Sequence, residues 1–190
     1  VEARPGKPQA LQPGTARAQA ARARAAQTLS RTAQEAGRPA DINTRYAVGS
    51  ISKQFTAAAL LLLQEEGKLS LDDKVSKYFP NLTRAAEISI RQLLSHTSGY
   101  EDYAPQDYII PDWTRPITPA AILDRWANKP LNFDPGTKWQ YSNTNYVLAG
   151  EIFEKVSGVK LVDFLTTRIF APLEMRSAGD WPPANPADAL

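Results

Sequence analysis

The longest apolar stretch of the chain predicts a helix that begins near Ser50 and ends before Gly67. Between Phe55 and Leu63, Thr56 is the only polar side chain, and glycine is a common residue just after the end of a helix. A helix that is apolar on nearly every side is expected in the interior of a domain. We therefore expect the rest of the fold to be arranged around this helix.

Apolar positions recur at helical spacing in the second half of the chain. Thr118-Pro119 places a capping residue before a proline, which is typical of a helix start. Glu87–Gly99 indicates a short extended entry followed by a helical turn. Little after residue 50 alternates as a strand does. The pattern predicts a mainly helical chain, with later helices over residues 118–130, 146–156 and 161–170.

The first 40 residues differ from the rest in composition and charge. They are rich in Ala, Arg, Pro and Gln, and seven Lys or Arg residues against two Glu give them a net charge of +5, whereas residues 41–190 carry −3. We interpret 1–40 as disordered or as a loosely docked helix. A basic tail for a polyanionic partner is the alternative. Residues 177–190 form a Pro-rich tail, so the candidate folded region is 41–176.

Composition excludes several classes of function. The absence of cysteine excludes thiol catalysis and disulfides, and a single histidine, His96, argues against a Ser-His-Asp triad and a multi-His metal site. We expect no cofactor. The mildly acidic folded region argues against nucleic-acid binding. No apolar run reaches the roughly 18 residues of a membrane span, and no signal peptide is visible, although the chain begins without Met.

Ser50 and Lys53 form the strongest candidate for chemistry. Residues three apart on a helix project from the same face, one turn above the other. A serine hydroxyl is a poor nucleophile unless a neighbour takes its proton or a positive field stabilises the alkoxide. Lys53 can do either, and the positive end of the helix dipole adds to that field. The pair predicts a nucleophile site.

Three segments carry a family resemblance when taken together: Gly49-Ser-Ile-Ser-Lys-Gln-Phe-Thr56, Leu94-Ser-His-Thr-Ser-Gly99 and Pro135-Gly-Thr-Lys-Trp-Gln-Tyr-Ser-Asn-Thr-Asn-Tyr146. With Ile169-Phe-Ala-Pro-Leu-Glu-Met175, they resemble the class C β-lactamase-like serine hydrolases, which include D-alanyl-D-alanine carboxypeptidases and β-lactamase-type carboxylesterases. The resemblance covers roughly residues 41–176. It implies serine acyl hydrolysis of a β-lactam, a D-Ala-D-Ala-like peptide or an ester, in the periplasm or outside the cell.

The resemblance also implies roles for individual residues. Ser50 would be the acylated nucleophile and Lys53 its partner, with Tyr141 as the proton shuttle. Asn143 would hydrogen-bond Lys53 and a substrate carbonyl. Trp139 has two interpretations, as part of the substrate pocket or as a core residue. We interpret His96 as a turn residue whose ring ties a loop down.

A third family motif, Lys-Thr/Ser-Gly or His-x-Gly on an edge strand, has no match in the chain. In the family that strand supplies one of two oxyanion-hole N–H groups. We therefore expect this chain to hold the helical subdomain of the α/β β-lactamase/transpeptidase-like fold and to lack most of the antiparallel-sheet subdomain. The alternative to an enzyme is a catalytically incompetent fragment or interaction module. Either would expose an apolar face for a second chain or an oligomer to cover.

Overall fold

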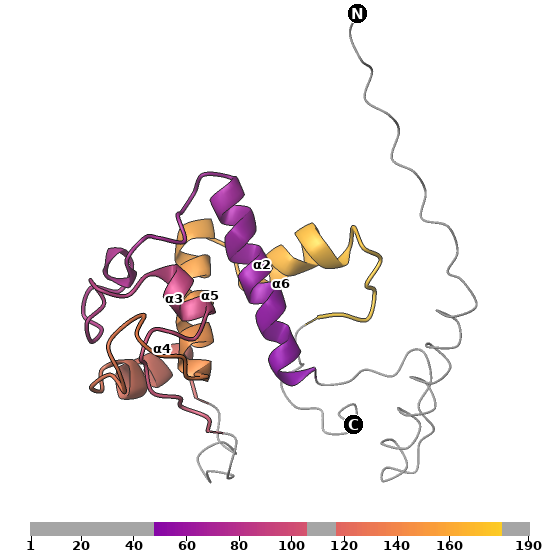
Figure 1. Cartoon of the computed structure of the whole chain (residues 1–190). Coiled ribbons are helices and arrows are strands. Elements are labelled where there is room, and N and C mark those ends of the chain that lie inside the picture. Colours follow the sequence, from indigo (N-terminus) through magenta and orange to yellow (C-terminus); the bar gives the residue numbers. More distant parts are fainter. Residues whose placement is uncertain (1–47, 106–116, 180–190) are drawn as a thin grey trace, which may run out of the picture. The chain divides into compact units, whose positions relative to one another are not determined.

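The computed structural model describes residues 48–105 and 117–179 (Figure 1). The segment 1–40 and most of the Pro-rich tail 177–190 lie outside the described residues, so the interpretations of both remain predictions. The described part belongs to one structural unit.

The predicted first helix is present, with a different start. Gly49–Ile51 form a 3-10 turn, η2, in which Gly49 has a φ of 51°, and helix α2 then runs over Ser52–Glu65. One face of α2 is buried through Thr56, Ala59, Leu60 and Leu63. Leu61 is 44% exposed. Within the described residues α2 is therefore covered on one side only, and the expectation of a helix surrounded by protein is not met there.

Helix α5, Asn143–Ser157, is the element on which the described helices converge. It contacts α2, α3, α4 and α6, and its Leu148, Ala149, Ile152 and Phe153 are fully buried. The helix ends at Gly158, which adopts the left-handed conformation with a φ of 72° and so closes the last turn without the strain a side chain would add. Sequence periodicity predicted this helix and its end, but placed its start three residues late.

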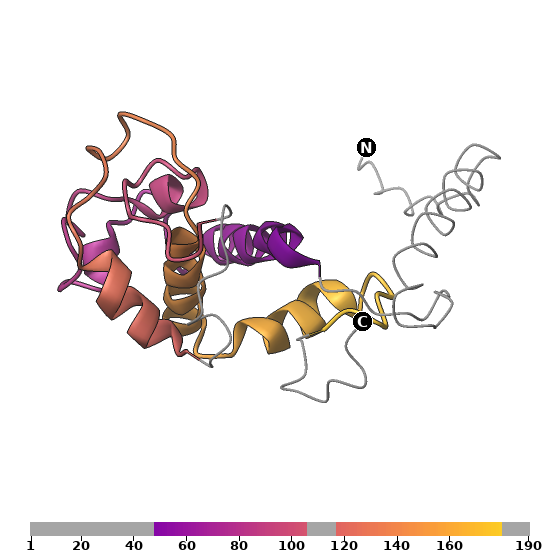
Figure 2. The same ribbon diagram turned by 90° about the horizontal axis from the view of Figure 1, so that it is seen from below.

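Shorter helices complete the unit. Helix α3 spans Ile90–Leu94 and begins with a capping box between Ser89 and Gln92. Thr118 caps α4 through a hydrogen bond from the Ala121 N–H, as predicted. Two α-helices each continue directly into a π-helical segment, and Figure 2 shows their ribbons running on without a break. Their parts are α4 at Pro119–Ile122 with η5 at Leu123–Ala127, and α6 at Leu161–Leu165 with η6 at Thr166–Phe170.

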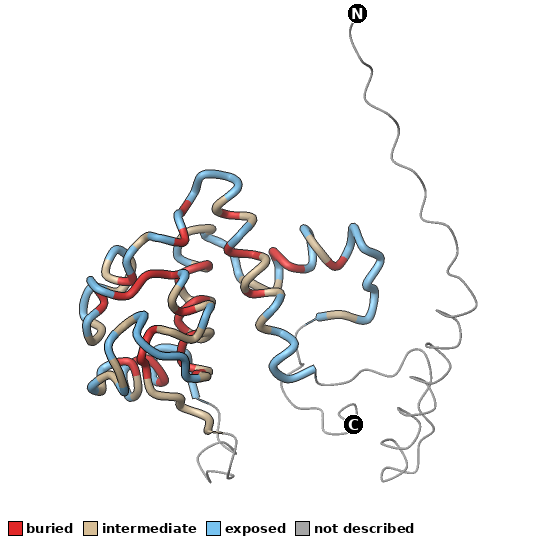
Figure 3. The backbone as a smooth tube through the Cα atoms, in the orientation of Figure 1, coloured by how far each residue is buried: buried red, intermediate tan, exposed pale blue. Residues whose placement is uncertain are grey.

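The prediction of a mainly helical chain is confirmed. Across residues 48–105 and 117–179, β pairing is limited to one antiparallel bridge between Lys74 and Ser89, close to the 3-10 turn η3 at Val75–Lys77. Buried segments gather where α2, α3 and α5 meet (Figure 3). Large fully buried side chains there are Leu60, Leu63, Ile90, Leu93, Leu148 and Ile152. In the part of the chain that the structure describes, no helix combines the length and the hydropathy of a membrane span.

Candidate active site

The structure brings Ser50, Lys53, Tyr141 and Asn143 together, although about 90 residues separate the two pairs. Ser50 lies in the turn η2, and Lys53 lies in the first turn of α2. Tyr141 belongs to the loop before α5, and Asn143 is the first residue of α5. The Ser50 Oγ lies 2.6 Å from the Tyr141 hydroxyl, and the Lys53 Nζ donates to the Ser50 Oγ at 3.1 Å and to the Asn143 Oδ1 at 2.6 Å.

The chemistry of these groups orders the hydrogen bonds. A lysine ammonium has donors only, so the Ser50 Oγ accepts from Lys53. The Tyr141 hydroxyl donates to the Asn143 Oδ1 at 3.3 Å. In that arrangement the Ser50 hydroxyl directs its own hydrogen at the Tyr141 oxygen. The site therefore offers the serine hydroxyl a hydrogen-bond acceptor on one side and a cation on the other.

The Lys53 ammonium also lies over two aromatic rings. Its Nζ is 5.0 Å from the ring centroid of Tyr141 and 5.6 Å from that of Tyr146, within the range in which a ring quadrupole attracts a cation. The Tyr146 hydroxyl in turn donates to the Leu94 carbonyl, which anchors this ring to α3. Lys53 of α2 is thus positioned by contacts from α5 and from the loop that precedes it.

His96 supports the loop that carries Tyr141. Its Nδ1 accepts a hydrogen bond from the Ser142 N–H at 3.2 Å, its carbonyl accepts from the Gln140 N–H, and its ring packs on Tyr141 with centroids 4.6 Å apart. Burial, and then the nearby positive charge of Lys53, lower the pKa of His96. A neutral imidazole can accept the Ser142 hydrogen, so these contacts fit the interpretation of His96 as a residue that ties down a loop.

Trp139 lies at the edge of the same group. Its side chain is 66% exposed, and its ring meets His96 edge-on with centroids 6.0 Å apart. An exposed tryptophan does not pack in the core, so that interpretation is wrong. Its place beside the Tyr141 loop leaves the prediction of a pocket-lining residue standing.

Asp102 is a member of the site that the sequence did not reveal. Its Oδ1 accepts hydrogen bonds from the Asn143 backbone N–H at 2.9 Å and from the Asn143 Nδ2 at 3.1 Å, and its Oδ2 lies 3.2 Å from the same Nδ2. The Asn143 Nδ2 also donates to the Ala104 carbonyl at 3.3 Å. Both amide hydrogens of Asn143 thus have acceptors within the protein, and its contact with a substrate carbonyl stays a prediction. The only signal in sequence was an acidic residue soon after Ser98-Gly99.

No metal site accompanies this group: residues 48–105 and 117–179 contain no cluster of three or more His, Asp or Glu side chains able to hold an ion.

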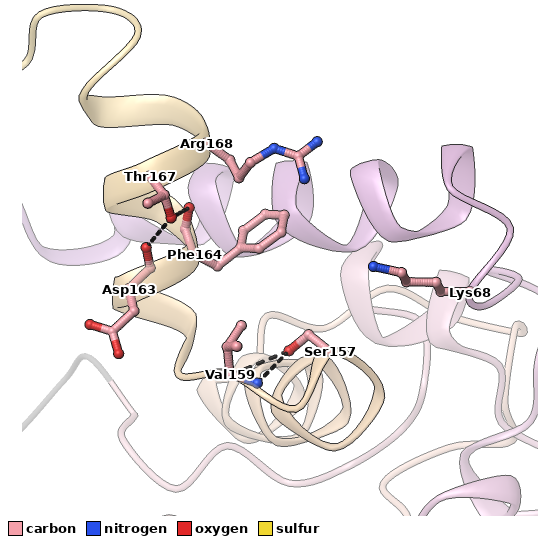
Figure 4. Close-up of a pocket in the computed structure, with 7 residues that line it drawn as sticks. All are labelled: Lys68, Ser157, Val159, Asp163, Phe164, Thr167 and Arg168. Atoms are coloured by element: carbon pink, nitrogen blue, oxygen red, sulfur yellow. Dashed lines mark hydrogen bonds between the residues drawn. The ribbon is translucent and has the colours of Figure 1, made fainter.

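A cavity of about 350 Å³ lies elsewhere, beside α6 and η6 (Figure 4). The two cationic side chains that line this cavity, Lys68 and Arg168, each form an ion pair with Glu66. None of the predicted site residues lines it. The lining residues are Lys68, Ser157, Val159, Asp163, Phe164, Thr167 and Arg168.

Comparison with known families agrees with the motifs. The family described as Beta-lactamase has a sequence model that matches residues 10–190. The chain belongs to the β-lactamase family. The helical architecture of the described residues is that of the helical subdomain of the β-lactamase/transpeptidase-like fold.

Relatives of this β-lactamase-family chain include proteins whose names indicate different activities. Penicillin-binding protein 4* of Bacillus subtilis is 39% identical over 140 residues. A D-stereospecific amidohydrolase from Streptomyces has 39% identity and a TM-score of 0.63 over 69% of this chain and 43% of that one. A class C β-lactamase solved with cefoxitin has 30% identity and a TM-score of 0.62 over 78% of this chain and 40% of that one.

The β-lactamase-family chain spans only part of these proteins. The match to penicillin-binding protein 4* covers 73% of this chain and 31% of the length of that protein. The relatives show the family to which the chain belongs.

Proposed function

We propose that this protein is a serine acyl hydrolase that works through an acyl-enzyme on Ser50. The observation that carries the proposal is the position of the Ser50 Oγ, which lies 2.6 Å from the Tyr141 hydroxyl and 3.1 Å from the Lys53 Nζ. A serine between a proton acceptor and a cation meets the requirements of an activated nucleophile.

The first half-reaction follows from these contacts. The Ser50 Oγ attacks the acyl carbonyl carbon while its proton passes to the Tyr141 oxygen, which accepts it as a phenolate after its own proton has been released. Lys53 stabilises the negative charge that develops on Oγ. Tyr141 then gives the proton to the departing nitrogen of an amide or β-lactam, or to the departing oxygen of an ester.

In the second half-reaction, water attacks the Ser50 ester. This releases the carboxylic acid and restores the serine hydroxyl. Asn143 holds Lys53 in place through its Oδ1, and Trp139 contributes an exposed apolar wall for the substrate.

The substrate class is a β-lactam, a D-Ala-D-Ala-like peptide or a carboxylic ester. The relatives include a penicillin-binding protein, a D-stereospecific amidohydrolase and a β-lactamase, and these names support an amide-type bond as the one cleaved. The same relatives support a periplasmic or secreted location.

A substrate panel tests the proposal. A chromogenic cephalosporin, a D-Ala-D-Ala peptide and a p-nitrophenyl ester are each incubated with the wild type, with Ser50→Ala and with Ser52→Ala. Ser52 is the matched control, because it is an exposed serine at the start of the same helix. Hydrolysis of one substrate class by the wild type and Ser52→Ala, and not by Ser50→Ala, is the expected result.

The 190 residues contain no third motif, so we expect them to turn substrate over slowly when they are assayed alone. Loss of one oxyanion-hole donor costs on the order of 10²- to 10³-fold in rate, and the sequence contains no Lys-Thr/Ser-Gly or His-x-Gly. We expect acylation of Ser50 to be measurable and turnover to be slow. Binding of a substrate without acylation or turnover would favour the alternative, an interaction module that uses the same fold without the chemistry.

A further inference from the structure

We infer that Asp102 is a positioning residue that holds the Asn143 amide with its oxygen toward Lys53, so that the lysine keeps a fixed acceptor. The inference rests on the proposed function, because it assigns Asp102 to the same reaction.

The orientation of the amide follows from the groups that surround it. On one side, the Asn143 Nδ2 faces three acceptors, which are the two carboxylate oxygens of Asp102 and the Ala104 carbonyl. On the other side, the Asn143 Oδ1 faces two donors, the Lys53 Nζ and the Tyr141 hydroxyl. Every contact pairs a donor with an acceptor.

The reversed amide would oppose a charged group on each side. Its NH₂ group would face the Lys53 ammonium, and its oxygen would face the Asp102 carboxylate. Hydrogen bonds to a charged group are stronger than neutral ones, so Asp102 and Lys53 together select one orientation. Removal of the carboxylate leaves Lys53 as the only charged group that orients Asn143, and the lysine then loses its fixed acceptor at 2.6 Å.

Asp102 also accepts a backbone hydrogen bond at the start of α5, and a test must distinguish this helix-capping contact from the positioning of the Asn143 amide. Its Oδ1 accepts the backbone N–H of Asn143, the first residue of α5, where a carboxylate stabilises a helix start. Asp102→Asn keeps one oxygen, which can still accept from that N–H and from the Asn143 Nδ2, but it removes the negative charge and turns the second acceptor into an NH₂ group, which meets the Asn143 Nδ2 as donor against donor. This variant therefore preserves the cap and weakens the hold on the amide.

The test compares wild type, Asp102→Asn and Asp124→Asn. Asp124 is the matched control, because its carboxylate accepts from the Asn128 amide on an exposed helix surface away from Ser50. Phosphonylation of Ser50 by a fluorophosphonate, with loss of fluoride, stands in for acylation and is followed by intact mass. The maximal labelling rate is separated from the probe concentration that gives half of it. Melting temperature reports the cap.

We expect the maximal acylation rate of Asp102→Asn to fall about tenfold or more, with the half-saturating concentration within about twofold of wild type and the melting temperature nearly unchanged. Asp124→Asn acylates as the wild type does. An unchanged maximal rate in Asp102→Asn overturns the inference. A change confined to the half-saturating concentration also overturns it, because Asn143 would then act on the probe.

A second readout needs no acylation. In the wild type, the side-chain amide hydrogens of Asn143 should give two resolved NMR signals that exchange slowly with water, and these signals should shift and exchange faster in Asp102→Asn. If wild type shows no acylation, the proposed function fails, and the amide signals alone then decide on Asp102. Rapidly exchanging Asn143 amide hydrogens in wild type overturn the positioning role.

Discussion

At the scale of the residue, the site depends on a small number of atoms held at hydrogen-bonding distance. The Lys53 Nζ is the centre of the group, because it donates to both Ser50 and Asn143 and lies over the Tyr141 ring. Its loss removes the positive charge beside the Ser50 Oγ and the donor that pairs with the Asn143 Oδ1. The two effects act on the same step, the formation of the acyl-enzyme.

Lys53→Met should lower the rate of Ser50 acylation by about a hundredfold or more, because the developing charge on Oγ loses its stabilising cation. The measurement is the rate of fluorophosphonate labelling by intact mass. Lys138→Met is the control, since Lys138 is an exposed lysine in the loop before Tyr141. Equal labelling of Lys53→Met and wild type would remove Lys53 from the mechanism.

His96 predicts a pH dependence of stability. Burial and the charge of Lys53 lower the pKa of His96 in the folded state, so below the usual imidazole value of about 6.5 the unfolded chain binds a proton that the folded chain does not. The contribution of His96 to stability is therefore fully present above about pH 6.5 and is lost as the pH falls below that value.

The carboxyl groups act in a lower pH range. Arg91 lowers the pKa of Asp72, and Arg84 lowers the pKa of Glu87, so the stability that these two carboxyls contribute begins to be lost only near pH 4.

The measurement is the melting temperature between pH 7.5 and pH 5. We expect a fall in wild type and a flatter profile in His96→Asn. Parallel profiles for the two proteins would show that the imidazole does not titrate differently on unfolding.

At the scale of the element, substitution of two glycines distinguishes the cost of backbone strain from the cost of a packing clash. Gly67, after α2, and Gly99, in the loop that leads to Asp102, both have positive φ, 69° and 89°. A side chain at Gly67 would meet nothing within 4 Å, whereas one at Gly99 would collide with the Phe133 carbonyl and press on Leu131. The Asn132 N–H also donates to the Gly99 carbonyl, so this loop is fixed against its neighbour.

Gly67→Ala should cost about 1 kcal/mol of unfolding free energy for the left-handed backbone. Gly99→Ala should cost about 1–3 kcal/mol more, because the neighbouring backbone must move. Urea denaturation of both variants measures the difference. Equal costs would show that the 131–133 segment yields without penalty.

The sequence predicted elements better than it predicted their arrangement. Apolar spacing and Gly158 located α5, and Thr118-Pro119 located the start of α4, because caps and periodicity are local signals. Local signals placed α2 at the centre of the fold, but α5 takes that role, since contacts between helices depend on the paths of the loops. Asp102 escaped notice for the same reason: 41 residues separate it from Asn143.

At the scale of the whole molecule, the described residues expose large apolar side chains. Leu61 on α2 is 44% exposed, and Leu173, after η6, is 66% exposed. Exposed apolar side chains favour association where they join into one patch, and we expect a second chain or another copy to cover these two.

We predict that the 190-residue chain associates as its concentration rises, and that the double variant Leu61→Lys/Leu173→Lys shifts it toward its monomer mass of 20.9 kDa. Size-exclusion chromatography with light scattering measures the mass. A monomeric wild type at every concentration would show that these side chains do not drive association.

The central claim is that Ser50 is an activated nucleophile. The most direct measurement is intact mass after incubation with a penicillin and, separately, with a fluorophosphonate, on wild type and on Ser50→Ala shown to be folded. One adduct is expected on wild type, located by peptide mapping on Ser50, and none on the variant. Folded wild type that gains no adduct from either probe, or an adduct that persists in Ser50→Ala, would contradict it.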